Sequence, residues 1–160
     1  MRSLIKIMTI LLIVLIAFKV DARDAKPSMK QLEVIQSVSK KYNVKMSHLL
    51  KIAYVESRFK QDAVRVNTNG TIDVGMFQIN SIHFDTTCKG LDVLKLQGNA
   101  ECAAKILKSH SKHSSKDAQW IARYHSKTPS LKAKYYQKLN RAPVYGPYVD
   151  APIFNLVALK

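Results

Sequence analysis

Apolar residues recur at helical spacing in the first part of the chain that follows residue 27. Ser28 and Gln31 form a capping box, in which a hydroxyl begins a helix and a glutamine three positions later supports it. The next apolar residues keep a helical period up to a plausible stop at Asn43: Leu32, Ile35, Val38 and Tyr42. This pattern predicts a helix over about 28–43.

A second helical pattern begins a few residues later. Ser47 is the predicted N-cap, and the helix ends near Glu56-Ser57. Its inward face is predicted to hold Leu49, Leu50, Ala53 and Tyr54.

The helical period disappears over 63–80. Apolar and polar residues alternate there on both sides of Asn69-Gly70, a dipeptide that strongly favours a tight hairpin turn. The alternating apolar residues are Val64, Val66, Ile72 and Val74. We therefore expect a β-hairpin between two helical regions.

Three further helices are predicted toward the C-terminus. One is marked by Cys102, Ala103, Ile106 and Leu107, one runs over 117–124, and one runs over 130–139 after Pro129. Residues of about 142–160 contain three prolines and are expected to form an extended tail on the body. The chain is thus predicted to be a single α+β domain over 23–160, mostly helical, with a small β-hairpin lobe.

The N-terminus has the pattern of a secretory signal peptide. Arg2 and Lys6 precede a short apolar run over 7–18, and Val20-Asp21-Ala22 resembles a cleavage site. An uncleaved membrane anchor is the alternative, although the run is shorter than the roughly 20 residues that a spanning helix needs. We expect residues 1–22 to be removed, which leaves a periplasmic or secreted protein without a stable membrane anchor.

Charge is the unusual feature of the composition. Lys and Arg number 26 against 11 Asp and Glu, whereas the hydrophobic share of 47% is ordinary for a globular protein. Losing residues 1–22 would remove three basic residues and one acidic residue and leave a net charge of +13. This favours an anionic partner. Because the lysines do not form a stripe with interleaved aromatic residues, nucleic acid is not the expected partner.

Cys88 and Cys102 are the two cysteines of the chain. In an exported protein such a pair predicts a disulfide, with two buried thiols as the alternative. His110 and His113 have a possible ligand spacing, but Ser and Lys surround them, so a solvated face is the preferred interpretation. We expect no metal and no cofactor.

Two carboxyl groups stand out as candidates for catalysis. Glu56 ends an apolar helical stretch, where the helix dipole and apolar neighbours disfavour its charged form and raise its pKa. A solvent-facing helix-end glutamate is the alternative. Asp73 lies on the second strand of the predicted hairpin. A helix end facing a hairpin would form a cleft with one carboxyl on each wall, an arrangement that is used to cleave glycosidic bonds.

The sequence around these two residues resembles the lysozyme-like lytic transglycosylases, and within them the small exported branch associated with secretion, conjugation or pilus machines. The matching blocks are Glu56-Ser57-Arg58-Phe59 and the stretch from Asp73 to Ser81, DVGMFQINS. Residues 99–107 resemble the family's N-x-x-x-G-x-x-I-L helix, and Tyr124 resembles the tyrosine of its Y-N motif. The resemblance implies a lysozyme-like fold that binds peptidoglycan glycan strands.

The resemblance also implies roles for individual residues. Glu56 would protonate the glycosidic oxygen and then act as a base, giving a 1,6-anhydro product. The residues that would position Glu56 or bind the sugar are Ser57, Phe77, Gln78, Asn80 and Tyr124. The sequence departs from the family pattern at Gln61, Ala103 and His125, where the family usually has Pro, Gly and Asn.

The same residues are similar to those of chicken-type lysozymes, which would use both Glu56 and Asp73 for hydrolysis. Those enzymes usually carry four disulfides, whereas this chain has two cysteines. The sequence therefore favours the transglycosylase interpretation and leaves the role of Asp73 open between catalysis and bracing of the hairpin. A third hypothesis is a non-catalytic factor that only binds peptidoglycan.

Overall fold

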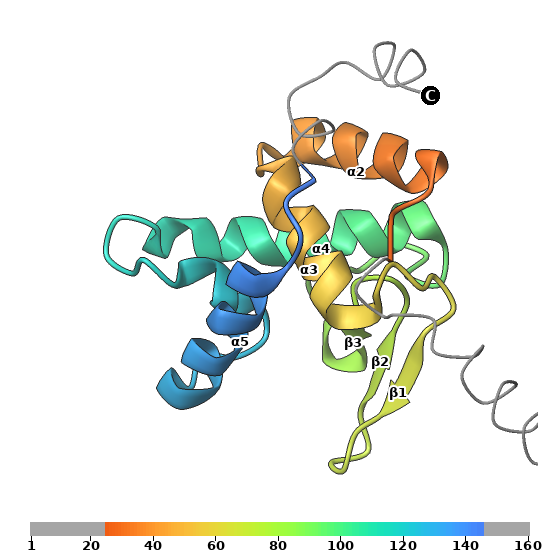
Figure 1. Cartoon of the computed structure of the whole chain (residues 1–160). Helices are drawn as coiled ribbons and strands as arrows, with labels where there is room; N and C mark the ends of the chain where they lie inside the picture. Colours follow the sequence, from red (N-terminus) through yellow and green to blue (C-terminus); the bar gives the residue numbers. More distant parts are fainter. Residues whose placement is uncertain (1–24, 146–160) are drawn as a thin grey trace, which may run out of the picture.

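The computed structural model describes residues 25–145 (Figure 1), so the predicted signal peptide and residues 146–160 of the predicted tail lie outside the description. This part of the chain contains four α-helices, several short 3-10 helices and a three-stranded antiparallel sheet with strand order β1-β2-β3. The predicted α+β class, mostly helical with a small β lobe, is confirmed.

Helix α2 (Met29–Tyr42) begins and ends as its sequence predicts. The Ser28 hydroxyl accepts from the Gln31 backbone N–H, and the Gln31 side chain accepts from the Ser28 N–H. Asn43 ends the helix in the left-handed conformation. The predicted apolar face is buried at Leu32, Ile35 and Val38.

Helix α3 (Met46–Ser57) begins earlier than predicted, because Lys45 and not Ser47 is its N-cap. The Met46 side chain is buried, so tertiary packing determines where this helix begins and Ser47 lies inside its first turn. The predicted inward residues of this helix are all buried. Its end near Glu56-Ser57 is also confirmed, since Arg58 and Phe59 have φ of 56° and 64° and turn the chain away.

The predicted hairpin forms between β1 (Val64–Val66) and β2 (Ile72–Val74). A third strand, β3 (Ile79–Asn80), pairs with β2 and was not predicted, because two residues are too few to show a period. Asp73 on the central strand is the register partner of both Arg65 and Asn80. The apolar side chains of β1 remain exposed, so its alternating pattern does not reflect burial.

The helix predicted around Cys102 is α4 (Leu96–His110), which is buried along most of its length. The predicted helix over 117–124 is only partly correct, since a 3-10 helix, η4 (Trp120–Tyr124), occupies its second half. The Asp117 carboxylate accepts from the Gln119 backbone N–H, and this local turn competes with helix formation.

Helix α5 (Pro129–Arg141) extends the prediction by two residues at its C-terminal end and begins at Pro129 itself. After α5, Tyr145 packs against the rings of Tyr54 and Phe59 and donates a hydrogen bond to the Ala25 carbonyl. The described start of the predicted tail, residues 142–145, therefore packs on the body through Tyr145.

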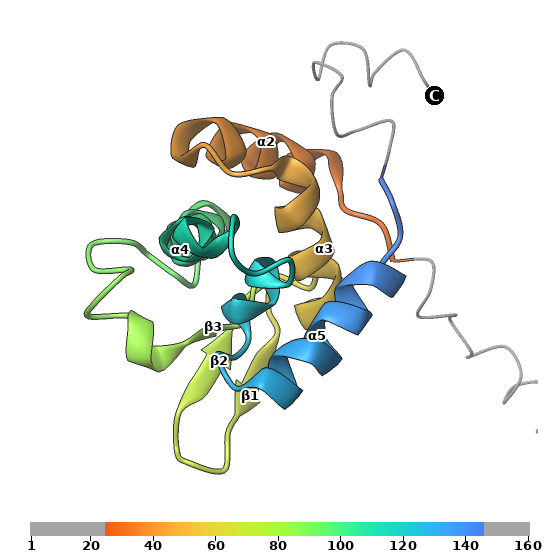
Figure 2. The same ribbon diagram turned by 90° about the vertical axis from the view of Figure 1, so that its left-hand side faces the viewer.

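Two perpendicular views show how these elements place the site. Helix α3 runs from α2 toward the sheet, and α5 lies at the same end of the molecule as the sheet (Figures 1 and 2). The end of α3 that carries Glu56 therefore meets both the β lobe and α5. Among the helices of residues 25–145, none combines the length and apolar character of a membrane span.

Candidate active site

Glu56 lies in the last turn of α3 and is partly buried. Burial raises the pKa of its carboxyl to about 7, and the nearby negative charge of Asp73 acts in the same direction. A hydrogen bond from Tyr135 and the positive charges of Arg65 and Lys138 oppose this shift. A carboxyl with such a pKa is protonated in a large fraction of molecules near neutral pH and can serve as a general acid.

Tyr135 on α5 is the direct partner of Glu56. Its hydroxyl donates a hydrogen bond of 2.6 Å to Glu56 Oε1. Burial, together with the charge of Glu56, raises the pKa of this phenol well above 10, so Tyr135 remains a proton-bearing donor. The ring of His125 stacks on Tyr135, with centroids 4.7 Å apart and planes inclined by 8°.

Sequence reasoning missed Tyr135. The residue is 79 positions away from Glu56, so no local motif joins the two. Its spacing with Leu131 and Leu139 on α5 is a signal in the sequence, but that spacing indicates only an inward face of the helix.

Asp73 is buried on β2 and is bound from both neighbouring strands. Arg65 donates to Oδ2 from Nε at 3.1 Å and from Nη2 at 2.5 Å, and Asn80 Nδ2 donates to Oδ1 at 2.7 Å. Hydrogen bonds that involve charged partners are among the stronger ones in proteins. Both oxygens of Asp73 are therefore engaged by the sheet that carries it.

The turn between β2 and β3 is anchored to two helices. Ser57 Oγ, at the end of α3, donates to the Met76 carbonyl at 2.7 Å, and the Tyr124 hydroxyl donates to the Phe77 carbonyl at 2.8 Å. Both contacts are to the backbone of the turn. Ser57 and Tyr124 thus hold the turn in place beside Glu56.

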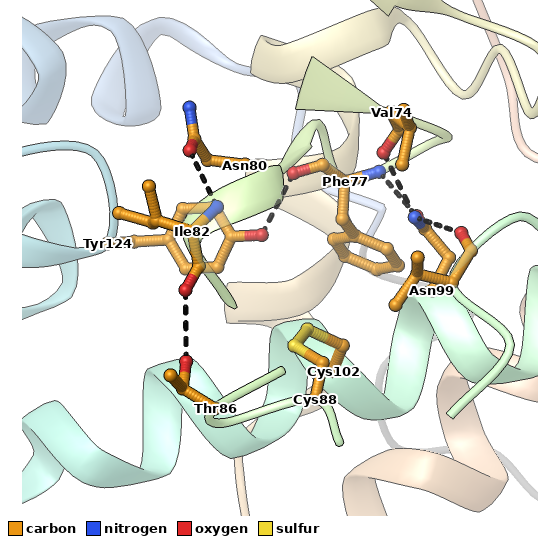
Figure 3. The surroundings of a disulfide bond; sticks show 10 residues. Val74, Phe77, Asn80, Ile82, Thr86, Cys88, Asn99, Cys102 and Tyr124 are labelled. Atoms are coloured by element: carbon orange, nitrogen blue, oxygen red, sulfur yellow. Dashed lines mark hydrogen bonds between the residues drawn. A yellow bond between two sulfur atoms is a disulfide. The ribbon is translucent and has the colours of Figure 1, made fainter. Parts of the chain in front are cut away.

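Buried Asn99 on α4 completes this anchoring (Figure 3). Its amide donates to the carbonyls of Val74 and Val93 and accepts from the Phe77 N–H. A Cβ at Gly75 would lie 2.3 Å from the Asn99 amide nitrogen, and Gly75 has φ of +76°, so the turn requires glycine.

The cleft between the sheet, α3 and α5 has a volume of about 520 Å³. Five of the predicted site residues line it: Glu56, Asp73, Gln78, Asn80 and Tyr124. Ser57 and Phe77 are not part of the lining, and the Phe77 side chain is fully buried in the core. The further lining residues are Arg65, Asn67, Thr68, Asn69, Thr71, Ile79, Ile82, His83, Ile106, His125 and Leu131.

The three departures from the family pattern have different surroundings. His125 lines the cleft, as described above. Gln61 Nε2 donates to the Leu94 carbonyl at 3.2 Å, which holds the chain after α3 against the loop before α4. Ala103 is fully buried on α4, where a small side chain is accommodated.

The predicted disulfide between Cys88 and Cys102 is present (Figure 3), with a Cα–Cα distance of 5.1 Å. It joins the loop after β3 to α4, and both cysteines are buried. In residues 25–145, no group of three or more His, Cys, Asp or Glu side chains is arranged to hold a metal ion.

Comparison with known proteins identifies the family of the chain. Over 57 residues the chain is 39% identical to the protein IpgF of Shigella flexneri and to that of Shigella sonnei. The aligned stretch covers 36% of this chain and only 38% of the length of these relatives. No solved structure matches the chain significantly. The sequence model of the Transglycosylase SLT domain matches residues 33–140, which include the whole cleft. The chain therefore belongs to the Transglycosylase SLT domain family.

Proposed function

We propose that this protein is an exported lytic transglycosylase that cleaves the β-1,4 bond between N-acetylmuramic acid and N-acetylglucosamine in peptidoglycan. The observation that carries this proposal is Glu56, a carboxyl with a pKa of about 7 on the wall of a polar cleft. The family supports the substrate class.

Glu56 has two successive tasks in the proposed reaction. The protonated carboxyl gives its proton to the glycosidic oxygen while the bond from that oxygen to C1 of the muramyl sugar breaks. The resulting carboxylate then takes the proton of the 6-hydroxyl of the same sugar, whose oxygen bonds to C1. The product is a 1,6-anhydro sugar, no water is consumed, and Glu56 regains its proton.

Tyr135 assists the reaction between the two proton transfers, while Glu56 is a carboxylate. Its hydroxyl donates to Oε1, which stabilises the carboxylate that remains after the first proton transfer. The second oxygen, Oε2, is then the atom that exchanges the proton with the substrate.

Asp73 has a bracing role in this proposal. Its two oxygens accept from Arg65 and Asn80, so it joins all three strands of the sheet. The competing function is lysozyme-type hydrolysis, with Asp73 as the second catalytic carboxylate, and it is favoured by the presence of Asp73 in the same cleft as Glu56.

Export and cellular context complete the proposal. The N-terminal pattern supports removal of residues 1–22 and a periplasmic or secreted location. The strong positive charge supports retention on the anionic wall, and the resemblance to the branch associated with secretion, conjugation or pilus machines supports work beside one of them.

The test compares Glu56→Gln with Glu33→Gln, a matched substitution on the exposed face of α2. Glu56→Gln should lower turnover of purified sacculi by a factor of about 10² to 10⁴ or more, because the general acid is removed. Glu33→Gln should be as active as the native protein. Full activity of Glu56→Gln in a folded protein would contradict the proposed enzyme.

A further inference from the structure

We propose that His125 is a positioning residue for Glu56. Its imidazole stacks on Tyr135 and thereby keeps the Tyr135 hydroxyl on Glu56 Oε1, so that Oε2 faces the substrate with the proton. This inference rests on the proposed role of Glu56 as the general acid.

The three side chains form a connected series. His125 follows η4, Tyr135 is on α5, and Glu56 is at the end of α3. The first contact is a parallel ring stack at 4.7 Å, and the second is a hydrogen bond of 2.6 Å. His125 thus touches the partner of Glu56 and reaches the acid only through it.

The stack pairs a buried ring with an exposed one. Tyr135 is only 3% exposed, whereas His125 is exposed and lines the cleft. A hydrogen bond weakens steeply when its angle departs from linear. A flat ring against the phenol restricts its tilt and keeps the hydroxyl directed at Oε1.

The stack adds no charge to the site at neutral pH. Partial desolvation, and then the positive charges of Lys138 and Arg65, hold the pKa of His125 below its usual value, while the negative charge of Asp73 acts in the opposite direction; the net shift favours the neutral ring. The charged groups that act on Glu56 are Arg65 on β1, Asp73 on β2 and Lys138 on α5. Tyr124 on η4 and Tyr135 on α5 are neutral hydroxyls beside it.

The sign of the expected effect follows from the Tyr135 bond. This bond stabilises the carboxylate of Glu56 and lowers its pKa. Loss of the stack should weaken the bond, destabilise the carboxylate formed during the reaction, and raise the pKa of Glu56. The general acid would then be protonated up to a higher pH, but kcat would fall.

The experiment uses three variants that separate the ring from its polarity. His125→Ala and His125→Asn remove the ring, whereas His125→Phe keeps a flat ring without nitrogen atoms. The first two should lose kcat on sacculi by a factor of about ten, within the range for a weakened hydrogen bond to a charged group, with little change in KM. In the pH–rate profiles of these two variants, the alkaline limb should shift to higher pH by about half a pH unit or more. His125→Phe should match the native protein in kcat and in the pH of the alkaline limb.

Two further readouts show whether His125 acts through Tyr135. In a Tyr135→Phe background, His125→Ala should cause no additional loss of kcat, because the bond that it supports is already absent. Titration of the Glu56 carboxyl by ¹³C NMR should show the same upward pKa shift without any measurement of activity.

Several results would overturn the inference. These are a loss in His125→Phe as large as in His125→Ala, an additive loss in the Tyr135→Phe background, or a Glu56 pKa that is unchanged or lowered in His125→Ala. An active Glu56→Gln would instead contradict the proposed function. The two failures are therefore distinguishable.

Discussion

Arg65 and Asp73 face each other across β1 and β2, and two nitrogens of Arg65 donate to a single oxygen of Asp73, Oδ2. Asn80, the partner of Asp73 on β3, donates to the other oxygen. Asp73 thus lies in the cleft with both oxygens already bound. This arrangement favours a brace of the β lobe over a free nucleophile.

The first prediction concerns Asp73→Asn. The variant should retain substantial activity and release anhydro products, because the proposed reaction needs no second catalytic carboxylate. Since the Arg65 side chain is 57% exposed, solvent screens the ion pair, and its loss should lower the free energy of unfolding by only about 1 kcal/mol. Product analysis and urea denaturation measure the two effects. A stable but inactive Asp73→Asn would contradict the bracing role.

The second prediction concerns the disulfide. Cys88 and Cys102 are separated by 14 positions, and closing such a loop stabilises a protein by roughly 3 kcal/mol in the chain-entropy model. The double variant Cys88→Ala, Cys102→Ala should lose about this much free energy of unfolding by urea denaturation. Its activity well below the melting temperature should be close to native, because neither cysteine lines the cleft. An unchanged unfolding free energy would contradict this account.

The third prediction concerns the buried Glu101 on α4. Burial would raise the pKa of this carboxyl, but hydrogen bonds from Gln97, Lys41 and Tyr42 outweigh burial and lower the pKa to about 2. Its contribution to stability is therefore complete above the unfolded pKa near 4.5 and is lost as the pH falls toward 2.

Glu101→Gln should remove this pH dependence. The variant should be less stable by about 1 to 3 kcal/mol at neutral pH, because the polar groups around a buried position lose their charged acceptor. The difference from the native protein should shrink between pH 4.5 and 2 in urea denaturation at stepped pH. A difference that stays constant over this range would show that Glu101 does not titrate as described.

Local sequence signals predicted the elements whose causes are local. The Ser28–Gln31 capping box, the Asn69-Gly70 turn and the apolar end of α3 each depend on neighbouring residues, and each appears in the structure. Glu56 could be selected as a candidate for the same reason, since its apolar helix-end context is visible in the sequence.

The partners of the site residues depend on long-range packing and could not be predicted. Tyr135 reaches Glu56 from 79 positions away, and Asn99 reaches Phe77 from 22 positions away. The start of α3 was misplaced for a related reason, because burial of Met46 and not the capping tendency of Ser47 determines it. Tertiary contacts override local preference at these positions.

Mass spectrometry of the fragments that the native protein releases from purified sacculi tests the central claim most directly. The proposed reaction transfers the muramyl sugar to its own 6-hydroxyl, so each cut should leave a 1,6-anhydro end, one water lighter than a hydrolytic end and without a reducing group. The Glu56→Gln protein should release almost none of these fragments. Fragments with reducing ends, heavier by one water, would contradict the account and establish a lysozyme-type hydrolase.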